Sequence, residues 1–182
     1  MKRMLMIALA LLTLAAIVMA QDLPSGAVFF GTGFQAKTAG SLQPNQVHGW
    51  MAQCKRNPDI PIGGFALTNY ACLIENYSAD GTTSVEPDID LVLLHKGWFT
   101  SGVQAAGGLA WNQQGVGGAF SGGFWATASI AKLIGIPNAL AVGSLTWSKA
   151  NVMTALQQPK LPMMLQDIGA FAQVRAGVGK SW

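Results

Sequence analysis

The chain has 182 residues, of which 51% are hydrophobic and only 10% are charged, and it contains 22 glycines. A soluble domain is typically about 25% charged, and disorder needs low hydrophobicity with high charge. The composition therefore excludes a disordered chain and argues against an ordinary cytosolic enzyme. Because the length suits one domain, we expect a single-domain protein of the membrane or the envelope.

The first 20 residues have the layout of a secretory signal peptide. Lys2 and Arg3 form a positive start, and residues 5–19 are apolar except for one threonine. This apolar core is shorter than the roughly 20 residues that a membrane-spanning helix needs, which disfavours a retained anchor. We predict a signal peptide at 1–20, cleavage after Ala20 and a mature domain at 21–182.

Removing the signal peptide changes the charge balance. Without Lys2 and Arg3, nine basic and eight acidic residues remain, a net charge of +1. Nine cations scattered over the mature chain do not form the concentrated basic surface that nucleic acid requires, so we expect no nucleic-acid partner. All 22 glycines lie after residue 20, which makes the mature part unusually rich in glycine.

After residue 20, apolar residues alternate with small or polar residues at period two, the pattern of β-strands. Val28, Phe30 and Phe34 share one face near the start, and the alternation is clearest at 168–182. Turn residues separate the alternating runs. Together these signals predict eight strands, at about 26–36, 47–56, 64–77, 84–99, 102–113, 116–131, 138–152 and 163–182.

Strands of about ten residues, apolar on one face and small or polar on the other, are typical of an outer-membrane barrel. A sheet in lipid must close on itself, because every backbone group there must be paired. We predict an all-β fold, a single closed antiparallel up-and-down β-barrel of about eight strands. The glycine excess fits an eight-stranded lumen, which side chains fill. The alternative is a helical hairpin in the inner membrane, for which 115–136, with Gly118 and Gly122 in small-xxx-small spacing, is the one candidate segment.

The signal peptide, the eight alternating segments and a final strand ending in an aromatic residue resemble the small outer-membrane β-barrel proteins of Gram-negative-type bacteria. In that class, the terminal aromatic residue and the apolar residues at alternate positions before it are a signal for the barrel-assembly machinery. The matching residues are Trp182, Val178, Ala176 and Val174, and Lys180 departs from the pattern. The resemblance implies an outer-membrane location, with membrane lipid and the assembly machinery as partners.

Cys54 and Cys72 are the only cysteines, and an exported location permits a disulfide between them. Their midpoint is residue 63, inside the turn sequence 61–64. A hairpin that turns there places the two residues side by side on neighbouring strands, where they can meet disulfide geometry. The alternative is two buried apolar thiols. We do not expect a metal pair, because third and fourth ligands are not nearby.

Glu86, Asp88 and Asp90 occupy alternate positions and therefore share one strand face. Because buried charges need partners, we expect these carboxylates to form a charge network with Lys96 or Arg175 across the lumen, or to be solvated at the barrel mouth. Binding of a hard cation such as calcium is the alternative.

The two histidines do not form a catalytic set in the sequence. His95 shares a face with Leu91 and Leu93, the predicted lipid side, and His48 lies near the first loop. An acyl hydrolase needs a base near a nucleophile and usually an orienting acid. The glycine-rich segments lack the Lys-Ser/Thr of a phosphate loop, so no cofactor is expected. Candidates for interfacial aromatic girdles are Trp50, Trp98, Trp111, Trp125, Trp147 and Trp182.

These features predict a structural or interaction role in the bacterial envelope, with an envelope partner that the sequence does not identify. A filled eight-stranded lumen argues against a general porin. Two alternatives stay open. One is a soluble periplasmic or secreted β-barrel that binds a hydrophobic ligand and would carry its apolar residues inside. The other is a lipid-modifying outer-membrane enzyme.

Overall fold

The computed structural model describes residues 23–39, 46–78, 81–113, 115–154 and 165–182, and the predicted signal peptide lies outside them. Among the described residues, no helix has the length and apolar content that crossing a bilayer requires. The elements are β1 (Gly26–Ala39), β2 (Gln46–Arg56), β3 (Ile60–Ile62), β4 (Phe65–Leu67), β5 (Asn69–Ser78), β6 (Thr83–Lys96), β7 (Phe99–Asn112), β8 (Gly115–Ser129), α2 (Ala131–Ile134), β9 (Ala139–Thr154) and β10 (Leu165–Ser181).

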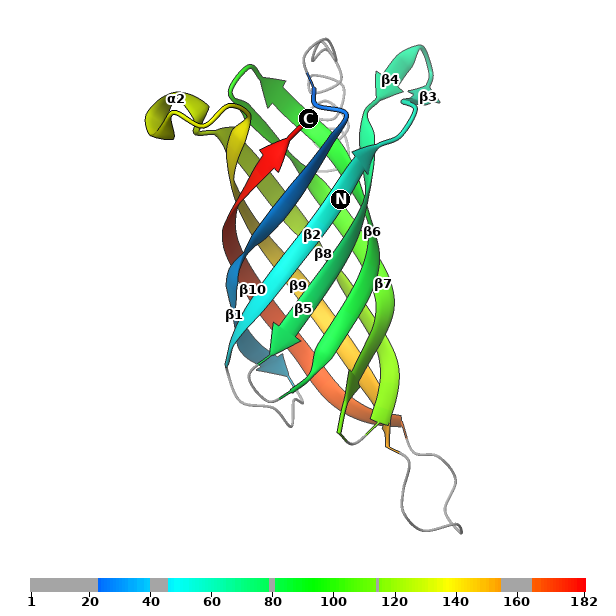
Figure 1. The fold of residues 1–182 in the computed structure, drawn as a ribbon. Coiled ribbons are helices and arrows are strands. Elements are labelled where there is room, and N and C mark those ends of the chain that lie inside the picture. The colour runs from blue at the N-terminus through cyan, green and yellow to red at the C-terminus, as the bar shows by residue number, and fades with distance from the viewer. Residues whose placement is uncertain (1–22, 40–45, 79–80, 114, 155–164) are drawn as a thin grey trace.

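Eight strands form a closed antiparallel barrel in the order β1-β10-β9-β8-β7-β6-β5-β2 (Figure 1), which confirms the predicted fold class. The main difference from the predicted strands is at 64–77. This segment divides into β4 and β5, because β3 and β4 pair in a separate hairpin that turns at Gly63 and Gly64, both with positive φ. The helical alternative for 115–136 is wrong, since β8 occupies most of that range.

The start of β1 and the end of β10 lie at the same end of the barrel, which we call the terminal end (Figure 1). Backbone bonds close the barrel there: the Ser25 N–H donates to Trp182 O at 2.9 Å, and the Trp182 N–H donates to Gly26 O at 3.0 Å. The β3–β4 hairpin and α2 also lie at the terminal end (Figure 1). We call the opposite end, where β1, β5, β7 and β9 finish, the loop end.

The two faces of the barrel wall differ in chemistry, as the period-two pattern predicts. Inward side chains are buried, whereas large apolar side chains stand exposed on the outward face. Phe124, near the middle of β8, is 59% exposed, and its cross-strand neighbour Leu145 is 43% exposed. We define the outer belt as the exposed apolar residues Phe30, Phe34, Leu73, Ile89, Leu109, Phe120, Phe124, Leu145, Val174 and Val178.

Glycines on the two faces meet different surroundings. At Gly108 and Gly123, which face the lumen, an added Cβ atom would overlap a carbonyl oxygen of the neighbouring strand. At Gly143, which faces outward, the nearest atom to such a Cβ is 3.7 Å away. The lumen side of the wall therefore requires glycine at close strand approaches, which is the crowding that the glycine excess predicts.

A β-bulge in β6 changes which side chains reach the lumen. The register against β7 shifts between Val92 and Leu94, so even-numbered residues face inward before the bulge and outward after it. Lys96 is therefore exposed at the end of β6, and His95 faces inward, with Nδ1 2.8 Å from Thr100 Oγ1. The predictions of Lys96 in the lumen network and His95 on the lipid side are wrong for this reason.

Candidate functional site

The lumen divides along its axis into two parts of different chemistry. The apolar half, toward the terminal end, is defined by a buried cluster: Ala27, Phe29, Trp50, Ala52, Cys54, Tyr70, Cys72, Ile74 and Val92. The polar half, toward the loop end, is defined by buried polar side chains: Gln35, His48, Asn76, Ser84, Glu86, Ser121, Thr146 and Gln173. The predicted carboxylates run along β6 from the polar half into the apolar half.

Glu86 lies in the polar half, where hydrogen bonds satisfy its carboxylate. It accepts from Ser84 Oγ at 2.7 Å, from Asn76 Nδ2 at 3.1 Å and from Ser121 Oγ at 2.8 Å. These donors come from β6, β5 and β8, so the network joins β8 to two strands that are not its neighbours in the sheet. A carboxylate that accepts three bonds is well stabilised despite its burial.

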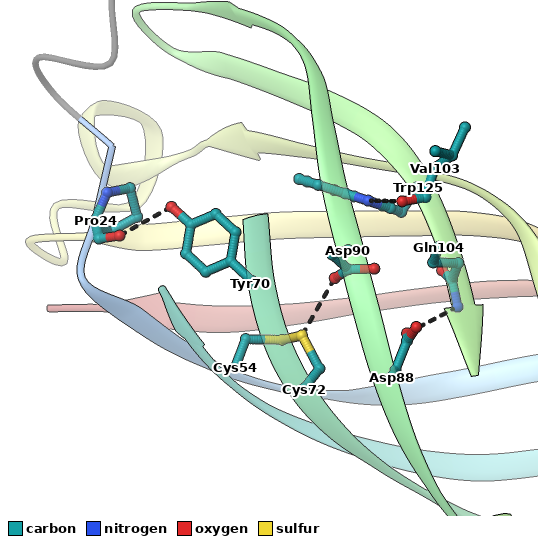
Figure 2. Close-up of a disulfide and its surroundings, with 9 residues drawn as sticks. All are labelled: Pro24, Cys54, Tyr70, Cys72, Asp88, Asp90, Val103, Gln104 and Trp125. Atoms are coloured by element: carbon teal, nitrogen blue, oxygen red, sulfur yellow. Dashed lines mark hydrogen bonds between the residues drawn. A yellow bond between two sulfur atoms is a disulfide. The ribbon is translucent and has the colours of Figure 1, made fainter. Parts of the chain in front are cut away.

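Asp88 and Asp90 differ from Glu86 because each keeps one carboxylate oxygen without a hydrogen-bond partner. The backbone N–H groups of Ile89 and Ala105 act on the Asp88 carboxylate. Gln104 Nε2 donates to one oxygen of Asp88 at 3.3 Å, and Asp90 Oδ2 lies 3.2 Å from Cys72 Sγ. A disulfide sulfur carries no hydrogen, so this second contact supplies no donor to an ionised Asp90. The Oδ1 atom of each residue is buried without a hydrogen-bond partner. Both carboxylates line a lumen cavity, described below, beside the disulfide (Figure 2).

Arg175 is the buried cation nearest these carboxylates. Its side chain is 3% exposed, and Nη2 donates to Gln173 Oε1 at 2.9 Å. Its charge acts on Glu86, Asp88 and Asp90, yet the described residues show no ion pair within 4.0 Å between them. The predicted lumen network therefore assembles around Arg175, with electrostatic contact at longer range in place of direct pairing.

Cys54 and Cys72 lie directly opposite each other on β2 and β5, with their Cα atoms 4.0 Å apart, and they form a disulfide. The β3–β4 hairpin connects their strands, as the position of residue 63 predicts. The disulfide lies on the lumen wall, where its sulfurs add to the apolar lining of the cavity (Figure 2).

A cavity of about 80 Å³ occupies the apolar half. Its aromatic walls include Phe29, Trp50, Tyr70 and Trp125, and Asp88 and Asp90 are part of its lining. Toward the terminal end Leu23 and Pro24 line it, and the Tyr70 hydroxyl donates to Pro24 O at 2.8 Å (Figure 2). This cavity combines an apolar body with a few convergent polar groups, the usual character of a ligand site.

Several predicted features take other positions in the structure. His48, the third residue of β2, lies near the loop end as predicted, but its side chain is buried in the polar half at 2% exposure, and neither ring nitrogen has a hydrogen-bond partner. Trp50 and Trp125 face the lumen instead of joining a girdle. Calcium binding is not supported, because the group of potential metal ligands that converges among the described residues is Cys54, Cys72 and Asp90, whose two sulfurs are bonded to each other.

The sequence interpretation did not single out some lumen residues that complete the site. Gln104, Ser121 and Gln173 each hydrogen-bond within the lumen and occupy polar positions in alternating strands, so their positions in the pattern were the signal. Trp125 interrupts the alternation of β8, and its Nε1–H donates to Val103 O on the neighbouring strand β7 at 3.3 Å (Figure 2). A large residue on a small-residue face was the signal for the cavity wall.

The residues that match the assembly signal lie on the final strand and point away from the lumen. Val174, Ala176, Val178 and Trp182 are all exposed, and Lys180 is exposed with them. Comparison of the chain with protein-family models, with curated proteins and with solved structures gave no match. The described geometry defines a closed eight-stranded β-barrel with a polar and an apolar lumen half.

Proposed function

We propose that this protein is an outer-membrane β-barrel with a structural or interaction role in the bacterial envelope, and not a general porin. The observation that carries the proposal is the outer belt. Soluble proteins rarely expose contiguous apolar patches larger than a few hundred Å². In lipid, the same surface is a requirement, because the bilayer core offers no hydrogen-bond partners for polar side chains.

The exposed tryptophans add support for a membrane location. Trp98 and Trp182 are 66% and 56% exposed near the terminal end, and Trp111 is 38% exposed at the loop end of β7. Tryptophans at both rims of an apolar band are typical of membrane barrels, where they sit at the two interfaces. Trp147, which is 57% exposed on β9, faces outward as well.

The filled lumen supports a role other than general permeation. Thr146, Arg175 and Glu86 are buried at 0%, 3% and 4% exposure, and they come from β9, β10 and, on the other side of the closed barrel, β6. Side chains of this size across an eight-stranded lumen leave no room for a wide water-filled channel. The proposal therefore places function at the rims and the surface, or in the small internal cavity.

A soluble β-barrel that binds a hydrophobic ligand is the second candidate, and the apolar half of the lumen favours it. The outer belt weighs against it, because such a barrel would need a polar outer face. The lipid-modifying enzyme has weaker support, since the buried ring nitrogens of His48 have no hydrogen-bond partner among the described residues and His95 contacts Thr100.

Arginine substitutions at matched exposed apolar positions test the membrane proposal. Phe124→Arg places a charge in the middle of the outer belt, where the expected loss of folding free energy in lipid vesicles is about 2–4 kcal/mol. Leu133→Arg, in α2 at the terminal end and 84% exposed, is the matched control with an expected loss of about 0–1 kcal/mol. Urea titrations of vesicle-folded protein measure both values.

The two variants also distinguish the second candidate. A soluble barrel tolerates arginine at either position, and Phe124→Arg would then raise solubility without detergent. Equal stabilities of the two variants in vesicles, with better solubility of Phe124→Arg, would contradict the outer-membrane proposal.

A further inference from the structure

We propose that the cavity in the apolar half of the lumen binds a small organic cation with an apolar body, such as a primary amine or a quaternary ammonium. The inference uses only the lumen and does not rest on the membrane location. Three features carry it: a formal excess of lumen carboxylates over the lumen cation Arg175, carboxylate oxygens without partners that line the cavity, and aromatic walls.

The charge balance of the lumen leaves a cation missing. Among its described side chains, Glu86, Asp88 and Asp90 share Arg175 as their common cation, a formal balance of −2 when all are ionised. Arg56, at the terminal mouth, pairs with Asp59 at 3.2 Å. Unpaired buried charges are strongly unfavourable, so a bound monocation would supply part of the missing charge.

The position of the unpartnered oxygens shows where such a cation would sit. Asp88 is only 3% exposed, lines the cavity, and keeps Oδ1 without a hydrogen-bond partner. Asp90 Oδ1 is in the same state. Glu86, one step further toward the loop end, has its bonds made and does not line the cavity. The ammonium group would therefore be held by Asp88 and Asp90.

The cavity walls suit the body of an organic cation. Trp50 and Trp125 line it together with Tyr70 and Phe29, and the faces of aromatic rings attract cations, with tryptophan the strongest. A volume of about 80 Å³ corresponds to room for roughly five water molecules. This space is comparable to a small amine and too small for a long acyl chain.

A metal ion fits this lining poorly. Calcium takes six to eight oxygen ligands, and Glu86, Asp88 and Asp90 do not converge on one point among the described residues. The converging group includes Cys54 and Cys72, which are joined to each other and have no thiolate to offer. The remaining walls are mostly hydrocarbon and aromatic, which match the body of an organic cation, and Thr100, Gln104, Thr127, Ser144 and Arg175 complete the lining.

Binding of three probes of similar shape to the purified, folded protein tests the proposal directly. Propylammonium, propanol and propionate share a short apolar body that suits a cavity of about 80 Å³ and differ in charge, and titration calorimetry in a non-ionic detergent measures their affinities. We expect saturable binding of propylammonium, at least tenfold tighter than propanol, and no binding of propionate. Equal affinities for the cation and the neutral alcohol, or no binding of propylammonium, would overturn the proposal.

Variants then locate the bound probe. The double variant Asp88→Asn with Asp90→Asn removes the charges at nearly constant shape, and we expect at least a tenfold loss of propylammonium affinity. Glu75→Gln is the matched control, because it removes a carboxylate from the outward face of β5, and its affinity should equal that of the parent. Unchanged binding by the double variant would contradict the proposed site.

Trp125→Leu provides a test that is independent of the carboxylates. Leucine keeps an apolar wall and removes the aromatic face, so we expect several-fold weaker propylammonium binding with little change for propanol. If the double variant does not fold, this variant and the probe series on the parent protein decide the outcome. Equal losses of affinity for both probes would show that the Trp125 ring contributes only packing, and this result would contradict the assignment of a cation as the ligand.

Discussion

The polar and apolar halves of the lumen differ in how their acidic side chains are hydrogen-bonded. In the polar half, Glu86 accepts bonds from three donors on three strands. In the apolar half, Asp88 and Asp90 each keep an oxygen without a partner beside a cavity. One run of carboxylates on one strand thus includes a satisfied structural group and a pair available to a ligand. Residue type alone does not distinguish these roles.

Arg175→Leu should have the largest effect, because both halves depend on this cation. Its removal takes the formal lumen charge from −2 to −3. Breaking a direct buried ion pair costs about 3–5 kcal/mol, and because Arg175 acts at longer range we expect a loss at the lower end, about 3 kcal/mol. We expect this loss in urea unfolding of the detergent-folded protein. Arg175→Lys keeps the charge and should lose clearly less; equal losses would show that packing, and not charge, explains the effect.

Glu86→Gln and Asp88→Asn compare the two halves most closely, since each replaces a carboxylate by its amide. The amide introduced at position 86 would turn a donor toward side chains that already donate, so we expect a loss of about 2 kcal/mol in unfolding free energy. At position 88 the new NH₂ group can take the place of Oδ1, which has no hydrogen-bond partner, and one negative charge is removed. The expected change there is within about 0.5 kcal/mol, or a gain in stability. Similar losses for both would contradict the division of the lumen.

Gly123→Ala and Gly143→Ala test the crowding of the wall with a smaller expected effect. At Gly123 the added Cβ overlaps the Leu145 carbonyl oxygen. At Gly143 the nearest atom to the added Cβ is the Arg175 carbonyl oxygen at 3.7 Å, an ordinary contact distance. Overpacking of this kind costs about 1–3 kcal/mol, and Gly143→Ala should stay within about 0.5 kcal/mol. Chemical unfolding of the two variants in parallel provides the comparison, and a tolerant Gly123 would mean that the lumen is wider than described.

The sequence predicted the fold well because the barrel wall repeats one physical rule. Period two, with apolar residues outward and small or polar residues inward, placed eight strands and the carboxylates on the correct face. The pairing of Cys54 with Cys72 was predictable because the turn between them contains Gly63 and Gly64. These features depend on local pattern, which a single sequence contains.

The features that were not predicted depend on departures from strict alternation and on contacts across the barrel. The bulge at Val92–Leu94 reverses the two faces, and this one shift misplaced Lys96 and His95. The burial of His48 was not predicted, because its ring lies against Gly33 on the neighbouring strand, a cross-strand contact that sequence distance does not reveal. The cavity depends on which large and small side chains oppose each other across the lumen, and only the closed barrel defines these pairs.

The location of the protein in its native cell tests the central claim most directly. Fractionation of the envelope, followed by gel electrophoresis of unheated and heated samples, reports both place and fold. The account predicts recovery in the outer-membrane fraction, extraction only with detergent, and a compact unheated band whose mobility changes after boiling. Recovery in the soluble periplasm without detergent would contradict it, because the outer belt would then face water.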